Sequence, residues 1–204
     1  MRSKYIQEDD VVRLRKAVRQ AAGNEAWLPL EISLETGLRI GDVVALKRVQ
    51  IGRDEDGYLI KYVAHKTGKK GVARLSDSLG KRLEARTGRV RGAYLFPPGR
   101  RGGKNVHLTR QACWARIKTA ASRLGIDGDG VSPHSLRKNF AVALMHERGL
   151  DAVRDALQHS NDAVTRIYAY ADTIMRADSD EPVRWCDLEL IVDYILERLR
   201  EKSS

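Results

Sequence analysis

The residues best suited to chemistry lie in one stretch, 132–170, where histidines, Arg137 and two tyrosines stand at short spacings. His134 and Arg137 are three residues apart, so on a helix they share one face. His159 follows, and Tyr168 stands nine residues after it. A phenol can attack a phosphodiester, and a cation can stabilise the negative charge that develops on the phosphate oxygens. The stretch therefore indicates phosphoryl transfer, with further groups supplied from elsewhere in the chain.

Hydrophobic periodicity predicts a mainly helical chain with a small three-stranded antiparallel sheet, an α+β fold. Helices are expected at 8–22, 27–35, 40–46, 77–87, 109–124, from 133 onward, and at 152–157, 162–170 and 183–201. Strands are expected at 49–51, 58–64 and 71–75. The turn between the last two strands, 66–70, carries three lysines. Pro133 opens the helix that bears His134, as expected for a proline in a first helical turn.

Composition narrows the classes of partner. The 204 residues include 37 Lys and Arg against 27 Asp and Glu, a net charge of +10. Such an excess favours a polyanionic partner such as nucleic acid, although charge alone is equally compatible with a merely basic soluble protein. The sequence holds neither a membrane-length apolar run nor a signal-peptide core. Cys113 and Cys186 form neither a disulfide framework nor a metal-binding pair, so a cytoplasmic chain is expected.

Five motifs follow one another along the chain: TGLR at 36–39, the lysine turn, HSLR at 134–137, LQHS at 157–160 and finally Tyr168. Their order and gaps resemble the catalytic domain of the tyrosine recombinases, the phage integrase family. The resemblance covers about residues 5 to 171. It implies that family's fold and the cleavage and rejoining of DNA in site-specific recombination and integration. The implied intermediate is a 3′-phosphotyrosyl link, formed without a metal or other cofactor.

The resemblance also implies a role for each motif residue. The implied catalytic set is Arg39, Lys66, His134, Arg137, His159 and the nucleophile Tyr168. The arginines would hold the non-bridging phosphate oxygens, because a guanidinium donates bidentately and keeps its charge. The lysine would protonate the leaving 5′-oxygen, and the histidines would bind the phosphate and assist proton transfer. Asp42 stands three residues after Arg39, where the family usually has an acidic residue.

Each of these residues also has a structural interpretation. A lone tyrosine more often fills a gap between helices, and Arg39 could simply pair with Asp42 on a short helix. Lys69 is the alternative to Lys66 as the acid, since both lie in the same turn. Tyr170 is the alternative nucleophile, two residues after the tyrosine that the spacing favours.

Double-stranded DNA is the partner that the resemblance implies. Basic side chains expected to contact its backbone, which positions a protein without reading sequence, are Lys69, Lys70, Arg100, Arg101, Lys104 and Arg110. The family also implies self-association as a tetramer on DNA and accessory DNA-bending proteins. The setting would be bacterial, archaeal or phage-encoded, at the nucleoid.

The expected domains are a catalytic domain, 1–176, followed by a linker and an amphipathic C-terminal helix, 177–204. Leu188, Ile191, Ile195 and Leu199 form the apolar stripe of that helix. It would pack on its own domain or, as in the family, on a neighbouring protomer. Family members usually carry an additional N-terminal helical domain, so the chain is expected to be either a fragment or a small recombinase-like protein.

Two other functions fit the same residues. Type IB topoisomerases share the tyrosine and arginine chemistry but relax DNA without exchanging partners. A DNA-binding remnant that has lost catalysis would keep the basic surface alone. A covalent protein–DNA adduct separates the remnant from the two enzymes, and exchange of DNA partners separates the enzymes from each other.

Overall fold

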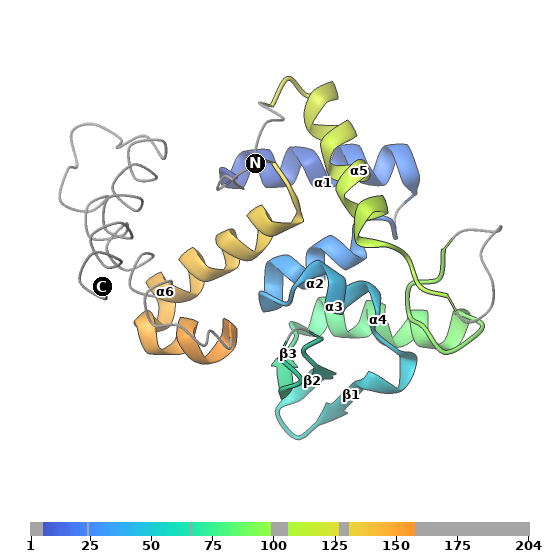
Figure 1. The fold of residues 1–204 in the computed structure, drawn as a ribbon, viewed down its shortest axis with the longest axis vertical. Coiled ribbons are helices and arrows are strands. Elements are labelled where there is room, and N and C mark those ends of the chain that lie inside the picture. The colour runs from blue at the N-terminus through green and yellow to red at the C-terminus, as the bar shows by residue number, and fades with distance from the viewer. Residues whose placement is uncertain (1–5, 24, 66, 99–105, 127–130, 158–204) are drawn as a thin grey trace, which may run out of the picture. The chain divides into compact units, whose positions relative to one another are not determined.

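The computed structural model describes residues 6–23, 25–65, 67–98, 106–126 and 131–157 (Figure 1). The chain divides into two compact units, 1–140 and 141–204. The first unit holds five complete helices and the sheet within its described residues. The predicted boundary at 176/177 lies outside the described residues and stays a prediction.

Helices form most of the first unit, in the order that the sequence predicts. Their bounds are α1 Glu8–Ala22, α2 Leu28–Thr36, α3 Ile40–Val44, α4 Asp77–Arg89 and α5 Arg110–Arg123, and α6 Pro133–Leu157 begins in this unit. Side-chain caps begin two of the helices: Ser76 Oγ accepts from Leu79 N–H, and Thr109 Oγ1 accepts from Ala112 N–H. The mainly helical α+β prediction is confirmed.

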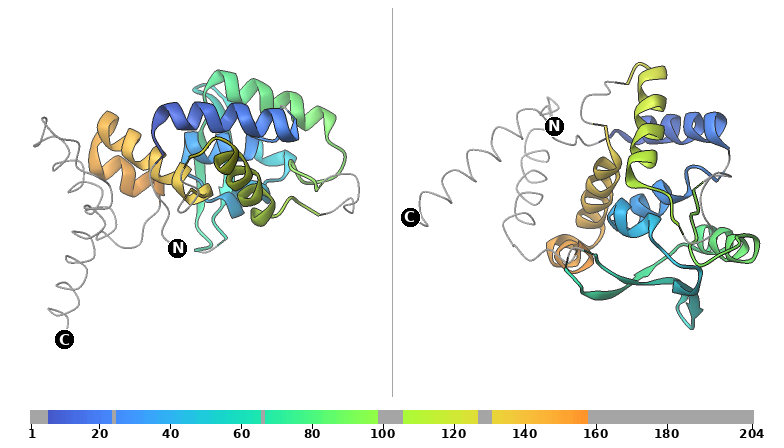
Figure 2. Two further views of the ribbon diagram at one scale, coloured as in Figure 1. Left: turned by 90° about the horizontal axis from the view of Figure 1, so that it is seen from above. Right: turned by 45° about the vertical axis from the view of Figure 1, so that its right-hand side comes forward.

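The sheet has three antiparallel strands in the order β1-β2-β3, as predicted. Its strands are β1 Ile51–Asp54, β2 Gly57–Val63 and β3 Lys70–Arg74. Along β2 the side chains of Tyr58, Ile60 and Tyr62 are buried, whereas Lys61 and Val63 are exposed. Helix α4 packs against β1 and β2 (Figures 1 and 2). The sheet therefore has one covered face and one face that carries lysines.

Several predicted boundaries differ from the structure, and two elements differ most. The first strand does not begin at 49, because residues 48–50 form a 3-10 turn, η1 Arg48–Gln50, and Val49 is 88% exposed. Gln50 stabilises this turn by accepting the Lys47 N–H at 2.7 Å and donating to the Lys61 carbonyl at 2.8 Å. The helix at 152–157 is not separate, since α6 continues to Leu157. One glycine inside a helix costs only about 1 kcal/mol, so Gly149 need not end it.

The core of the first unit lies between α2 and the elements around it. Trp27, Leu30 and Ile32 are fully buried, and α2 is buried on nearly every side. Helix α1 contacts α5, and the two cross in Figures 1 and 2. Arg13 of α1 also donates to the Leu124 carbonyl at 3.2 Å. The corner between α2 and α3, which carries Arg39, is thus built on the most buried helix of the unit.

Candidate functional site

Arg39 stands at the corner between α2 and α3, and buried hydroxyls fix that corner. Gly37 ends α2 with φ of 66°, a left-handed conformation that favours glycine. Ser33 Oγ donates to the Leu38 carbonyl at 2.8 Å, and Thr36 Oγ1 accepts the Leu38 N–H at 3.3 Å. Arg39 follows in extended conformation as the N-cap residue of α3. The backbone that presents this guanidinium is therefore held on both sides.

Arg137 reaches the same corner from a position 100 residues further along the chain. Its side chain lies on α6 and is 8% exposed. Its Nη1 donates a hydrogen bond to the carbonyl oxygen of Gly37, two residues before Arg39. A buried guanidinium needs such an acceptor because desolvation without a partner is costly. The structure thus brings the TGLR and HSLR motifs into direct contact.

His134 lies in the first turn of α6, one helical turn before Arg137. Its side chain keeps a large exposed surface, so it is accessible to a ligand. The pKa of the imidazole is lowered, first by partial desolvation among the surrounding protein atoms and then by the positive charges of Arg137, Arg39 and Lys138. These influences favour the neutral imidazole, which can accept as well as donate a proton.

Asp42 connects α3 with the lysine turn. Its Oδ1 accepts the backbone N–H of His65 at 3.0 Å. The turn is closed by Ala64 N–H donating to the Lys69 carbonyl at 2.8 Å and by Gly68 N–H donating to the Ala64 carbonyl at 2.7 Å. Lys66 itself lies outside the described residues. Its neighbour on the N-terminal side is nevertheless anchored beside the Arg39 corner, and Lys69 is exposed in the same turn.

Tyr62 is a residue near the site that the sequence reasoning missed. It is 8% exposed on β2, opposite Gly71 of β3. Burial raises the pKa of its phenol; Arg137 and Arg39 oppose this rise, and Asp42 adds to it. The hydroxyl therefore lies within the electrostatic reach of three charged side chains of the site. The strand pattern alone marks Tyr62 as an ordinary core residue, and only its position four residues before Lys66 could have singled it out.

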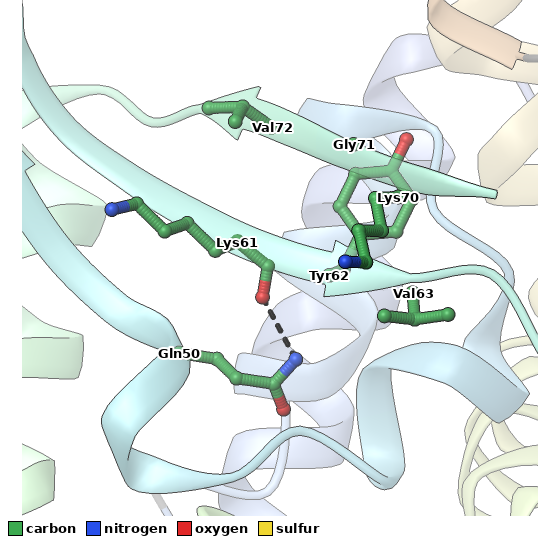
Figure 3. A pocket seen from close by; sticks show the side chains of 7 residues that line it. All are labelled: Gln50, Lys61, Tyr62, Val63, Lys70, Gly71 and Val72. Atoms are coloured by element: carbon green, nitrogen blue, oxygen red, sulfur yellow. Dashed lines mark hydrogen bonds between the residues drawn. The ribbon is translucent and has the colours of Figure 1, made fainter.

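A hollow of about 380 Å³ lies along β2 and β3. Figure 3 shows its lining, which consists of Gln50, Lys61, Tyr62, Val63, Lys70, Gly71 and Val72. Lys61 and Lys70, both exposed, belong to this lining, and the Gln50 amide nitrogen donates to the Lys61 carbonyl. Among the predicted site residues that the structure describes, Lys70 is the one that contributes to it. The hollow is therefore adjacent to the motif residues rather than formed by them.

Several other predicted residues can be placed individually. Arg110 is exposed in the first turn of α5, and Lys70 is exposed at the start of β3. On α5, Trp114 is 40% exposed and the Lys118 ammonium lies 5.1 Å from the centre of its ring. The predicted residues His159, Tyr168, Arg100, Arg101 and Lys104 lie outside the described residues. So do the alternative nucleophile Tyr170 and the apolar stripe of the tail.

The described part of the chain offers neither a metal site nor a membrane-spanning helix. No cluster of three or more His, Cys, Asp or Glu side chains there could hold a metal ion. Every helix in that part is too short or too polar to cross a bilayer. The groups that the structure does bring together are two arginines, a histidine, a carboxylate and a phenol. Such a set can bind an anion and move protons around it.

Comparison with known proteins identifies the family. The model of the phage integrase family matches residues 4–174. The tyrosine recombinase XerC of Erythrobacter litoralis (strain HTCC2594) is 31% identical in an alignment 182 residues long, which covers 83% of this chain and 56% of that protein. XerD of Caulobacter vibrioides is 32% identical in an alignment 181 residues long, which covers 82% of this chain and 57% of that protein. The chain belongs to the phage integrase family of tyrosine recombinases.

Solved structures support the same fold. The XerH site-specific recombinase, in a post-cleavage complex with a palindromic difH substrate, matches 88% of this chain with a TM-score of 0.70 and 19% identity, over 54% of its own length. The catalytic domain of bacteriophage HP1 integrase matches 89% of this chain with a TM-score of 0.60 and 22% identity, over 99% of its own length. The chain spans just over half the length of the curated relatives above.

Proposed function

We propose that this chain cleaves and rejoins double-stranded DNA in site-specific recombination, through a 3′-phosphotyrosyl intermediate. The observation that carries the proposal is the hydrogen bond from Arg137 to the Gly37 carbonyl. It joins the two arginine motifs at one corner, although the bonded residues are 100 positions apart. Two cations converging from distant segments suit one phosphate, because each can donate to a different non-bridging oxygen.

In this proposal Tyr168 attacks the scissile phosphorus. The new bond joins its phenolic oxygen to the 3′-phosphate, and the bond from phosphorus to the 5′-oxygen breaks. Lys66 gives a proton to the leaving 5′-oxygen, while the phenol proton passes to a nearby base, for which His134 is the candidate. Arg39, Arg137 and His159 hold the phosphate. The covalent link conserves the bond energy, so a different 5′-hydroxyl can reverse the step and exchange strands.

The DNA backbone would lie across the basic residues Lys69, Lys70, Arg100, Arg101, Lys104 and Arg110. Lys70 and Arg110 are exposed on different elements, as a broad contact surface requires. Affinity should therefore fall steeply with salt, since each neutralised phosphate releases counterions. A tetramer on DNA with accessory bending proteins completes the proposal, in a bacterial, archaeal or phage-infected cytoplasm at the nucleoid. Residues 1–176 would form the catalytic domain. Residues 177–204 would form a linker and a helix that packs either on its own domain or on a neighbouring protomer.

The test uses a suicide substrate with a nick close to the cleavage site. After cleavage the short fragment that carries the free 5′-hydroxyl diffuses away, and the protein stays covalently attached to the DNA. Wild type is expected to form a covalent adduct that survives denaturation, and Tyr168→Phe is expected to form none. Tyr170→Phe is the matched control and should retain the adduct. Because the cleavage sequence is unknown, the substrate is drawn from a randomised library. Failure of wild type to form any adduct would leave DNA binding alone, and plasmid relaxation without strand exchange would indicate topoisomerase-like action.

A further inference from the structure

Asn139 holds the backbone of Ile6, a residue 133 positions away. The Ile6 N–H donates to Asn139 Oδ1 at 3.1 Å, and Asn139 Nδ2 donates to the Ile6 carbonyl oxygen at 2.6 Å. Both residues are buried, with 7% of Asn139 and 2% of Ile6 exposed. The carboxamide offers one donor and one acceptor side by side, so it satisfies both backbone groups of a single residue. This pair of hydrogen bonds is called the Ile6–Asn139 clamp below.

The clamp acts on the helix that carries two motif residues. Asn139 follows Arg137 by two positions on α6, and successive helical residues are about 100° apart. The two side chains therefore leave the helix on nearly opposite sides. One is bonded to the Gly37 carbonyl and the other to the Ile6 backbone. Two polar anchors on opposite sides fix the rotation of the first turns of α6, and His134 lies in these turns.

An apolar contact would not fix this rotation equally well. Hydrophobic packing is non-directional, whereas hydrogen bonds weaken steeply when their angle changes. The Ile6 side chain is already buried in the core, so its packing would survive a small rotation of α6. The hydrogen bonds of the two Ile6 backbone groups would not survive such a rotation. Their loss is costly because a buried N–H or carbonyl would be left without a partner. The amide therefore contributes a directional restraint that apolar packing alone does not supply.

We propose that Asn139 is a positioning residue, which sets the rotation of α6 through the clamp and so directs Arg137 and His134 at the scissile phosphate. This inference rests on the proposed function, since the phosphate is the group to be aimed at. Asn139 itself is buried and does not contact DNA in this proposal. Misplacing a catalytic group by about 1 Å can cost about 100-fold in rate, so a small rotation is sufficient for a large effect.

The test compares Asn139→Ala with Ile6→Ala. The first variant removes the clamp and keeps the Ile6 side chain, whereas the second removes the side chain and keeps the backbone groups that Asn139 binds. Single-turnover adduct formation is measured at saturating DNA, with DNA affinity and Tm measured beside it. Asn139→Ala is expected to slow adduct formation by about 10- to 100-fold with affinity nearly unchanged. Ile6→Ala is expected to lower the Tm at least as much, yet to slow adduct formation by less than about threefold.

A second substrate separates positioning from a general loss of structure. A methylphosphonate at the scissile position replaces one anionic oxygen by a neutral methyl group, which reduces the need for arginine. If the clamp acts through Arg137, Asn139→Ala slows adduct formation less on this substrate than on the ordinary phosphodiester. An equal defect on both substrates, or an equal defect in Ile6→Ala, overturns the inference and leaves Asn139 a stabilising residue only.

A measurement without DNA keeps this inference distinct from the proposed function. The His134 imidazole titration is followed by NMR in wild type and both variants. A rotated α6 changes the distance of the ring from Arg39 on the neighbouring corner, so the titration midpoint is expected to move in Asn139→Ala and to stay in place in Ile6→Ala. If no variant forms an adduct, the proposed function fails while the titration still decides the clamp. An unchanged midpoint in Asn139→Ala overturns the positioning role.

Discussion

The Asp42 carboxylate accepts the backbone N–H of His65 at 3.0 Å, and this contact ties α3 to the turn between β2 and β3. Arg39 begins α3, and Lys66 follows His65 directly. The contact therefore holds the corner that carries Arg39 close to the turn that carries Lys66, the proposed general acid. The acidic residue expected three positions after Arg39 has a structural partner, which the sequence motif does not name.

The first prediction concerns that contact. Asp42→Ala removes the acceptor and should slow adduct formation about 10- to 100-fold, since a hydrogen bond to a charged group contributes about 1.5–3 kcal/mol. Asp42→Asn keeps an oxygen acceptor and should lie between Ala and wild type. The matched control is Asp56→Ala, which removes a carboxylate bonded to Arg74 at the opposite end of the same sheet. If both alanine variants are equally slow, Asp42 supports the sheet in general and not the lysine turn.

Removal of the Tyr62 hydroxyl is the second test. Tyr62→Phe keeps the buried ring and deletes the group that lies among the charges of Asp42, Arg39 and Arg137. We expect adduct formation to fall about tenfold, as for the loss of one hydrogen bond worth about 1 kcal/mol or slightly more. Tyr58→Phe is the control on the same strand, because it loses a 2.9 Å bond to Glu84 away from the site. Tyr58→Phe should lower the Tm without slowing cleavage. If Tyr58→Phe slows cleavage and Tyr62→Phe does not, Tyr62 has no part in the site.

The packing of α4 on the sheet can be tested with two glycines of one helix. A Cβ on Gly80 would lie 2.1 Å from Cγ of Tyr58, so Gly80→Ala forces the ring or the helix to move. Such overpacking costs about 1–3 kcal/mol and should lower the Tm in thermal unfolding. Gly88→Ala meets no atom within 4 Å and should stabilise α4 by up to about 1 kcal/mol. Equal Tm values for the two variants would contradict the close contact with Tyr58.

The pH dependence of stability follows from His134. Its folded-state pKa is lowered, so the unfolded chain binds this proton more readily than the native protein. Stability therefore rises with pH between the lowered pKa and the ordinary value of about 6.5, and it is lost as the pH falls through that window. His134→Gln removes this contribution, and its Tm should vary less than that of wild type between about pH 5 and 7. Parallel Tm curves for the two proteins would contradict the lowered pKa.

Most of the helices and strands that were predicted correctly can be recognised from local sequence patterns. Helices α1 and α5 were found because their apolar periodicity is local, and the Thr109 cap of α5 and Gly37 at the end of α2 are local as well. The start of β1 was misplaced because the η1 turn depends on a bond between Gln50 and the distant Lys61 carbonyl. The continuity of α6 through Leu157 was also missed. The end of a helix or strand is predicted wrongly where a contact with a residue distant in the sequence determines it.

The site likewise contains residues that the sequence predicts and contacts that it does not. Arg39 and Arg137 could be named from motifs, because family chemistry fixes their residue types and spacing. Their meeting at Gly37, the Asp42–His65 bond and the Ile6–Asn139 clamp span 100, 23 and 133 residues. Such contacts leave no periodic trace in the sequence. Tyr62 was missed because a buried strand residue looks the same whether its hydroxyl faces the core or a site.

The most direct test of the account is to identify the amino acid that carries the DNA. The trapped adduct is digested with protease and nuclease, and the peptide with an attached nucleotide is sequenced by mass spectrometry. We expect a 3′-nucleotide on Tyr168, in a peptide that also contains unmodified Tyr170. A nucleotide on Tyr170, on a serine or through a 5′-phosphate would contradict it.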